Sequence, residues 1–121
     1  MISHQGFLIS SPEYNSSIAP LFKNTIDWAS RQSDGEPPLA SFQGKVAGIM
    51  SASPGGLGGL RGLVHVRSML ENIGVMFIPN QIAVAKSHEV FNTDGTLKDK
   101  KQEEQIKKIG ADLTKILLKL G

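Results

Sequence analysis

The chain has 121 residues, 40% of them hydrophobic and 20% charged, which is enough for one folded domain and too short for two. It contains no cysteine, so disulfide scaffolds, Cys-ligated zinc, iron–sulfur clusters and thiol nucleophiles are excluded. No apolar run approaches the roughly 20 residues that span a bilayer, and the first residues lack the basic region of a signal peptide. We therefore expect one domain over residues 1–121, located in the cytoplasm and without a membrane partner.

The net charge of +2 is concentrated near the end of the chain, where residues 98–119 hold seven basic and four acidic side chains. Nucleic-acid binding surfaces usually have a larger basic surplus with interleaved aromatic residues, and this segment has no aromatic residue. We therefore expect no nucleic-acid partner. His4, His65 and His88 share no metal-ligand spacing, so no metal site is predicted.

Three short apolar runs indicate strands. Gly6–Ser10 is apolar on both faces, which is typical of a strand buried between two layers of helices. Val46–Met50 and Val75–Ile78 have the same character, and Pro79 is expected to end the latter. Gln81–Lys86 alternates weakly and is interpreted as an extended segment.

Amphipathic segments follow the first two of these runs. The first is expected to form a helix up to about Arg31, with Ser16 or Ser17 as its N-cap and Pro20 in its first turn. Apolar residues at helical spacing predict a second helix over residues 60–73. Alternating strands and helices predict an α/β fold, a parallel sheet with helices on both faces.

The last segment is expected to be a helix that begins after Asp99 as N-cap. Its basic residues together with an apolar stripe leave two interpretations open, a membrane-surface helix or a helix that covers the sheet. The stripe is continuous and acidic residues dilute the charge, which favours the second interpretation. The stripe consists of Ile106, Ile109, Leu113, Ile116, Leu117 and Leu120.

Two unusual loops, Pro12–Ser16 and Ser51–Gly59, each follow a strand and precede a helix. We expect them to share one edge of the sheet, because ligands of open parallel sheets bind outside the carboxyl ends of the strands. Five of the 13 glycines lie between residues 55 and 62, so the backbone there needs unusual angles or a close approach. The pattern is neither the dinucleotide fingerprint, since Arg61 replaces its last glycine, nor a P-loop. A tight turn without a ligand remains the alternative.

Several segments together resemble the NADPH-dependent FMN reductase family, flavodoxin-like enzymes that include quinone, chromate and azo-dye reductases. The resemblance is carried by Pro12–Asn15, Leu21–Trp28 and Ser51–Gly59, and it extends to Phe91–Asn92 and Asp94–Gly95. It implies a flavodoxin-like fold, FMN and NAD(P)H as cofactors, a small-molecule electron acceptor such as a quinone, and a homo-oligomer.

The resemblance also implies that the two loops bind the flavin, largely through backbone groups. Oriented N–H donors at helix starts favour the negative charge of a reduced flavin, so no catalytic side chain is predicted. For Tyr14, contact with the ring and no contact with it both stay open as interpretations. Trp28 is expected to pack, at a subunit interface by analogy with the family. The implied cofactor-binding residues are Pro12, Glu13, Tyr14, Asn15, Ser16, Ser53, Pro54, Gly55, Gly56, Gly58 and Gly59.

The sequence departs from the family pattern at one point. The family holds the FMN phosphate in a Ser- and Arg-containing loop after its first strand, and nothing before Gly6 corresponds to that loop. We therefore expect the domain to lack its N-terminal βα units, Gly6–Ser10 to be an edge strand open to another chain, and FMN binding to be weak. The expected function is NAD(P)H-dependent reduction of FMN, or of an acceptor through FMN. The alternative is a noncatalytic fragment that serves as an oligomerisation or regulatory module.

Overall fold

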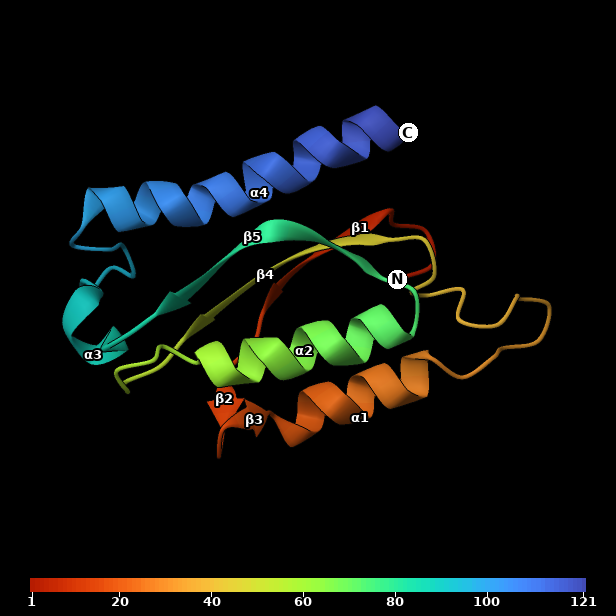
Figure 1. Cartoon of the computed structure of the whole chain (residues 1–121), viewed down its shortest axis with the longest axis horizontal. Coiled ribbons are helices and arrows are strands. Elements are labelled where there is room, and N and C mark those ends of the chain that lie inside the picture. Colours follow the sequence, from red (N-terminus) through yellow and green to blue (C-terminus); the bar gives the residue numbers. More distant parts are fainter.

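A parallel sheet of three strands forms the centre of the molecule in the computed structural model, which describes residues 1–121 (Figure 1). The strands are β1 (Gly6–Ser10), β4 (Val46–Ala52) and β5 (Met76–Val84), in the order β1-β4-β5. Apolar, β-branched side chains such as Val46 and Ile49 suit a strand that is covered on both faces. All three predicted strands are confirmed.

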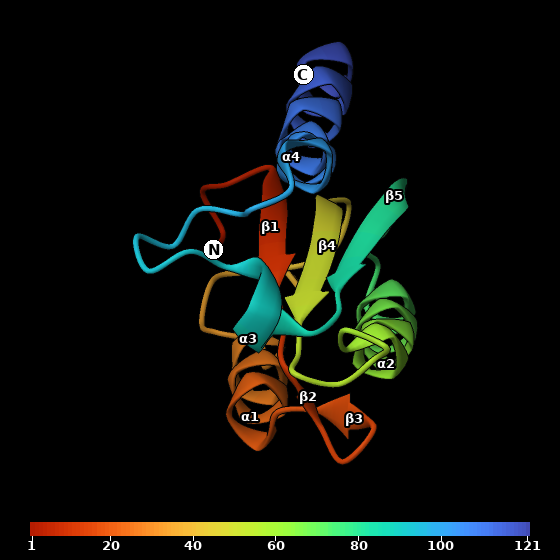
Figure 2. The same cartoon turned by 90° about the vertical axis from the view of Figure 1, so that its left-hand side faces the viewer.

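Helices cover both faces of this sheet (Figure 2). α1 (Pro20–Ala29) and α2 (Leu60–Asn72) lie on one face, and α4 (Lys100–Leu120) lies on the other. A single turn, α3 (Ser87–Val90), follows β5 at the end where the strand arrows point. This parallel sheet with helices on both faces confirms the predicted α/β fold.

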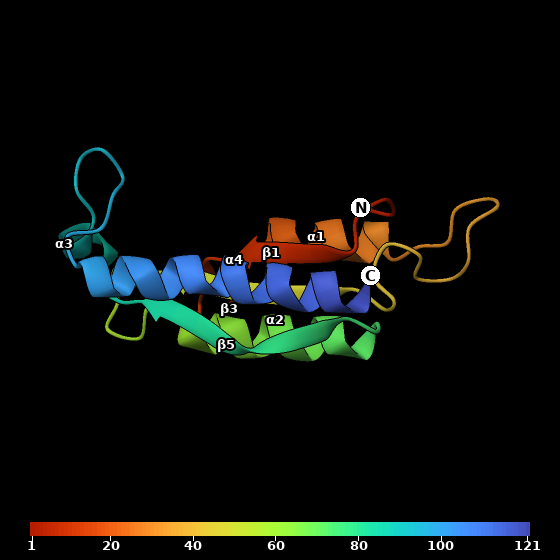
Figure 3. The ribbon, with the colours of Figure 1, turned by 90° about the horizontal axis from the view of Figure 1, so that it is seen from above.

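The core is divided between the two faces of the sheet. α4 buries Ile109 and Leu113 of its apolar stripe against Val46 and Ile78, which confirms that it covers the sheet. In the view from above in Figure 3, α4 runs along the length of the sheet. No helix of the chain is both long enough and apolar enough to cross a membrane. The larger cluster under α1 and α2 consists of Ile26, Phe42, Ala47, Ile49, Leu63, Val66, Leu70 and Val75.

β1 is an edge strand and is less buried than its sequence predicts. It pairs with β4 on one side only, from Gly6 opposite Val46 to Ser10 opposite Met50. Leu8 remains 55% exposed, so the expectation of burial on both faces is wrong for this strand. The reason is that the best-buried side chains of α4 pack on β4 and β5, which leaves the outer margin of the sheet partly open.

The prediction that Pro79 ends the third strand is also wrong, because β5 continues through it to Val84. The pairing with β4 shifts between Ala47 and Ile49, opposite the proline. β5 is the other edge of the sheet, and an edge strand tolerates the missing N–H of proline where a central strand does not. The part of the predicted extended segment from Gln81 to Val84 belongs to this strand.

The start of α1 differs from the sequence prediction as well. Neither Ser16 nor Ser17 caps the helix; its N-cap is Ala19, without a side-chain bond, and Pro20 occupies the first turn as expected. Instead, β2 (Glu13–Tyr14) and β3 (Ser17–Ile18) form a small antiparallel hairpin before the helix. This hairpin carries the first of the two predicted cofactor loops.

Candidate functional site

The two predicted loops meet at the carboxyl ends of the strands, as expected. In Figure 1 the strand arrows point to the left end of the molecule, where the hairpin, the start of α2 and α3 lie. We call this end the carboxyl rim; it consists of residues 12–18, the glycine loop over residues 53–59, and residues 85–87. Since parallel strands all end on the same side, the topology brings together segments far apart in the sequence.

Glu13 connects the hairpin to the first turn of α2. One carboxylate oxygen accepts a hydrogen bond from the backbone N–H of Gly62, and the other accepts one from Arg61 Nη2, both at 3.0 Å. The bond from the Gly62 N–H, supported by Arg61, lowers the pKa of Glu13 below its ordinary value despite partial burial. The carboxylate therefore stays charged at the positive end of the helix.

A second contact joins β3 to α2. Ser17 Oγ and His65 Nδ1 lie 2.8 Å apart, one turn further along the helix than Gly62. His65, which is itself exposed, thus links the hairpin to α2. The hairpin touches α2 through both of its strands.

The glycines of the glycine loop fall into two groups. A Cβ on Gly58 would lie 2.6 Å from Ala85 N, and one on Gly59 would lie 2.9 Å from the Ser51 side chain; both glycines have positive φ. A Cβ on Gly56 would meet nothing within 4 Å, and one on Gly55 only Ser53 Oγ at 3.7 Å. The packing of the chain itself thus requires glycine at positions 58 and 59, whereas Gly55 and Gly56 border open space.

Several backbone N–H groups on the rim have no acceptor within the chain. These are the N–H groups of Gly56 and Leu57 in the glycine loop and of Asn15 and Ser16 at the tip of the hairpin. Asn15 and Ser16 are also in the left-handed region, with φ of 50° and 65°. Non-glycine residues with positive φ are uncommon and are concentrated at functional sites.

A third segment, residues 85–87, supports the glycine loop, although its sequence does not indicate a binding site. The N–H of Lys86 donates to Gly55 O at 3.1 Å, and the N–H of Ser87 donates to Ser53 O at 3.0 Å. Ser51 Oγ also donates to Gly58 O at 2.7 Å, beneath the loop. A left-handed non-glycine residue such as Lys86, with φ of 49°, leaves no pattern in hydrophobic periodicity that would reveal it.

The predicted site residues are therefore not equivalent in the structure. Glu13, Ser16 and Ser53 are half-buried, and Gly58 and Gly59 are buried. The exposed ones, which form the outer surface of the rim, are Pro12, Tyr14, Asn15, Pro54, Gly55 and Gly56.

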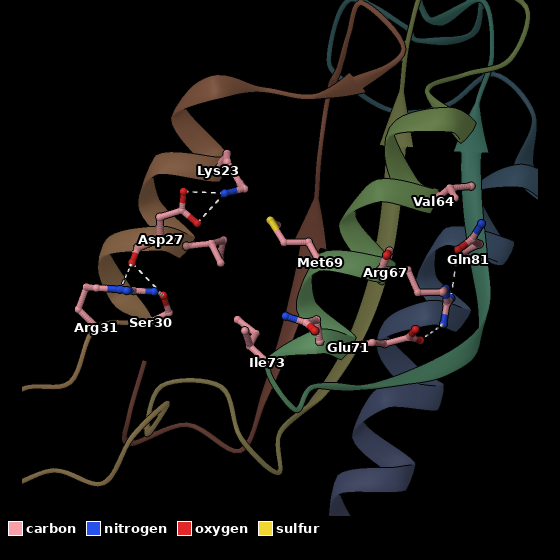
Figure 4. Close-up of a pocket in the computed structure, with 13 residues that line it drawn as sticks. Lys23, Asp27, Ser30, Arg31, Val64, Arg67, Met69, Glu71, Ile73 and Gln81 are labelled. Atoms are coloured by element: carbon pink, nitrogen blue, oxygen red, sulfur yellow. Dashed lines mark hydrogen bonds and ion pairs between the residues drawn. The ribbon is translucent and has the colours of Figure 1, made fainter.

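The largest of the five principal cavities, of about 970 Å³, lies away from the rim, between α1 and α2 (Figure 4). Four of its charged side chains form two ion pairs, Lys23 with Asp27 at 2.6 Å and Arg67 with Glu71 at 3.8 Å. Arg31 instead donates to Asp27 O and to Ser30 Oγ, both at 3.1 Å. None of the five principal cavities is lined by the hairpin or the glycine loop. The rim is thus an open surface.

Comparison with known proteins connects this rim to a family. The model of the NADPH-dependent FMN reductase family matches residues 1–89, which include both loops. An NAD(P)H-dependent FMN reductase of Pseudomonas aeruginosa is 38% identical over 100 residues, 82% of this chain and 51% of the relative. A probable NADPH:quinone oxidoreductase of Oryza sativa subsp. japonica is 36% identical over 117 residues, 94% of this chain and 54% of the relative.

A solved structure supports the same assignment. FerB, a flavoenzyme NAD(P)H:(acceptor) oxidoreductase from Paracoccus denitrificans, is 26% identical, with a TM-score of 0.75 over 93% of this chain and 61% of its own. The fold is therefore flavodoxin-like. The chain spans about half the length of the curated relatives it matches. With the family model covering both loops of the rim, the chain belongs to the NADPH-dependent FMN reductase family.

Proposed function

We propose that this chain is an NAD(P)H-dependent oxidoreductase of the FMN reductase type, which binds FMN on the carboxyl rim and reduces FMN or a small acceptor such as a quinone. The observation that carries the proposal is the meeting of the hairpin and the glycine loop at one end of the sheet. The names of the relatives, among them FMN reductase and quinone oxidoreductase, support the same chemistry.

The rim residues fit a flat, polar cofactor. Gly55 and Gly56 leave room for a ring to approach the backbone, and nothing in the packing of the chain accounts for their missing side chains. The free N–H groups of Asn15, Ser16 and Gly56 offer donors to the oxygen and nitrogen acceptors of the ring edge. Pro12, Tyr14 and Pro54 supply apolar surface beside them.

When bound, FMN supplies hydride transfer between the reduced nicotinamide and the acceptor. The chain's own residues bind and orient the ring, and their N–H groups stabilise negative charge at its polar edge. No side chain of the rim is required as a nucleophile or a proton donor in this proposal. This agrees with the absence of cysteine from the sequence.

We also propose that the chain alone holds FMN weakly. The rim is open, and neither loop lines any of the five principal cavities, so a flavin would be contacted from one side only. Small-molecule sites that bind tightly bury most of the ligand surface.

Self-association and a cytoplasmic location belong to the same proposal. The apolar side chains of Leu21 and Trp28 on α1 are 76% and 73% exposed, so neither packs within the chain. The expected place of Trp28 at a subunit interface stays part of the proposal. The open edge of β1 offers a second surface for another copy.

The proposal is tested by two measurements on the same preparation. Titration of FMN, followed by quenching of its fluorescence, should give saturable binding weaker than about micromolar, and NADPH oxidation with added FMN and a benzoquinone should exceed the protein-free rate. Gly56→Ala should weaken the binding of FMN. Gly110→Ala should not; this control glycine lies in α4, away from the rim, and a Cβ there would make only an ordinary contact with Leu8 at 3.9 Å. An NADPH oxidation rate equal to the protein-free rate would leave the noncatalytic alternative in place.

A further inference from the structure

Glu13 connects the hairpin to α2, the helix that follows the glycine loop. Both oxygens of its carboxylate are bonded to α2, one to the Gly62 N–H and one to the Arg61 guanidinium. Its side chain is only 10% exposed, whereas its neighbour Tyr14 is exposed. Glu13 therefore lies between the hairpin and the helix, and its polar atoms are already engaged.

Two glycines allow this close approach. A Cβ on Gly62 would lie 3.3 Å from Glu13 Cβ and 3.2 Å from Ser17 O, and a Cβ on Gly59 would lie 3.6 Å from Glu13 Cβ. Gly59 is the N-cap of α2 and also the last residue of the glycine loop. A side chain at Gly59, the residue through which the glycine loop enters the helix, would thus press against the stem of Glu13.

The electrostatics of this contact favour a fixed carboxylate. The first turn of α2 contains no acidic residue of its own, so Glu13 supplies the negative charge that a helix N-terminus favours. Charge-assisted bonds to a backbone N–H and to a guanidinium are among the stronger hydrogen bonds in proteins. The Ser17–His65 contact holds the other strand of the hairpin against the same helix.

We propose that Glu13 is a positioning residue, which holds the hairpin tip at Asn15 and Ser16 in a fixed place relative to the glycine loop and does not itself contact the flavin. The consequence for FMN rests on the proposed function. The positioning of the two loops is a property of the chain without ligand.

The first experiment uses amide NMR of the chain without FMN. In Glu13→Ala, the Gly62 amide should exchange at least about tenfold faster, because its charged acceptor is gone. The amide resonances of Ser16 and Gly59 should shift as the hairpin separates from α2. Arg61→Met is the matched control. It removes the ion pair between Glu13 and the exposed Arg61 guanidinium and keeps the hydrogen bond from the Gly62 N–H to Glu13. The amide resonances of Ser16 and Gly59 should therefore stay unchanged.

The second experiment titrates FMN into the same variants. Glu13→Ala should raise the dissociation constant about tenfold or more, which is the scale of one charged hydrogen bond. Glu13→Gln keeps one oxygen that can accept from the Gly62 N–H, so it should restore most of the Gly62 protection and most of the affinity. If Glu13→Ala does not fold, Glu13→Gln is compared with Arg61→Met: the Gly62 amide should exchange faster in Glu13→Gln, because only that variant replaces its charged acceptor with a neutral one. Equal Gly62 exchange in the two variants would overturn the inference.

The outcomes are separable. Weakened FMN binding with unmoved Ser16 and Gly59 amides would make Glu13 a direct ligand and overturn the inference. Unmoved amides with unchanged affinity would overturn it as well. If the wild-type chain binds no FMN, the proposed function fails for this chain, while the ligand-free spectra still decide whether Glu13 positions the loops.

Discussion

Single residues of the rim separate into those that the fold needs and those that it does not. Gly58→Ala should destabilise the chain by at least about 1–2 kcal/mol, because a left-handed residue gains a Cβ that also meets the backbone of Ala85. Gly56→Ala should change stability by less than about 0.5 kcal/mol, since the position is open and its φ is not positive. Urea denaturation followed by circular dichroism distinguishes the two. Equal losses in both variants would contradict the division of these glycines.

The carboxylate of Glu13 makes stability depend on acid pH. Its pKa is lower in the folded chain than in the unfolded chain, so the unfolded state binds more protons as the pH falls. The stabilisation is present in full above the unfolded pKa and is lost as the pH drops through the folded pKa. Asp94 and Asp112, whose pKa values are lowered by bonds from Thr96 and Lys108 respectively, act in the same direction.

Glu13→Gln should therefore flatten, without abolishing, the rise of stability with pH in the acid range below the ordinary pKa of a glutamate. Thermal unfolding at a series of pH values measures this slope. Glu104→Gln serves as the control, because Glu104 is exposed and accepts no hydrogen bond from a side chain. A slope as steep in Glu13→Gln as in the wild type would show that the contact with Gly62 is not maintained in solution.

At the scale of elements, a buried lysine holds the segment before β1. Lys45, which is 6% exposed at the start of β4, donates from Nζ to Met1 O at 2.8 Å, to Ile2 O at 2.9 Å and to His4 O. The ammonium also lies 5.8 Å from the centre of the Phe7 ring. A buried charge is tolerated when its donors are satisfied, as they are here.

Lys45→Met should lower the free energy of unfolding by about 1–3 kcal/mol, the scale of a bond to a charged group, and should speed amide exchange before β1. Lys119→Met near the exposed end of α4 should change neither quantity. Chemical denaturation and hydrogen exchange provide the measurements. An unchanged exchange rate at His4 would show that the lysine does not organise this segment.

Local pattern was sufficient for the long helices and the presence of the three central strands, and insufficient for the hairpin and for the end of β5. Periodicity predicted α2 and α4 closely, because each buries one apolar stripe over several turns. It missed the hairpin, since strands of two residues are too short to show alternation. It ended β5 at Pro79, because the tolerance of that proline depends on the strand lying at a sheet edge, which only the tertiary structure reveals.

The candidate site was predictable to the same extent. Composition and order located both loops, and parallel topology brought them to one end of the sheet. The contact of Glu13 with Gly62 spans 49 residues, and no local signal distinguishes a carboxylate that caps a distant helix from one that faces a ligand. The same holds for Lys45, which reads as a polar residue before a strand and proves to be buried.

For the whole molecule, the two edges of the sheet differ in how they are protected. β5 contains Pro79 and a shift in its pairing, and Arg67 reaches it by bonding Gln81 Oε1 at 3.1 Å and stacking 4.7 Å from the Phe77 ring. Prolines, irregular pairing and charged side chains are the usual means of keeping an edge strand from pairing with another chain. β1 itself contains no proline and no charged residue, and its pairing with β4 is regular from Gly6 to Ser10. Any pairing of the sheet with a second strand is therefore expected at β1.

This asymmetry gives a direct test of self-association. The bonds from Val46 N to Gln5 O and from Ser11 N to Met50 O fix the alternation along β1, so the N–H of Leu8 points away from β4. Leu8→Pro removes this outward N–H group and leaves the hydrogen bonds between β1 and β4 intact. Leu8→Ala shortens the side chain and keeps the N–H group. We expect light scattering to find a mass above 13.0 kDa for the wild type and for Leu8→Ala, and the monomer mass for Leu8→Pro. If Leu8→Pro stays associated and Trp28→Ser becomes monomeric, the contact lies on α1 and the edge of β1 is not the interface.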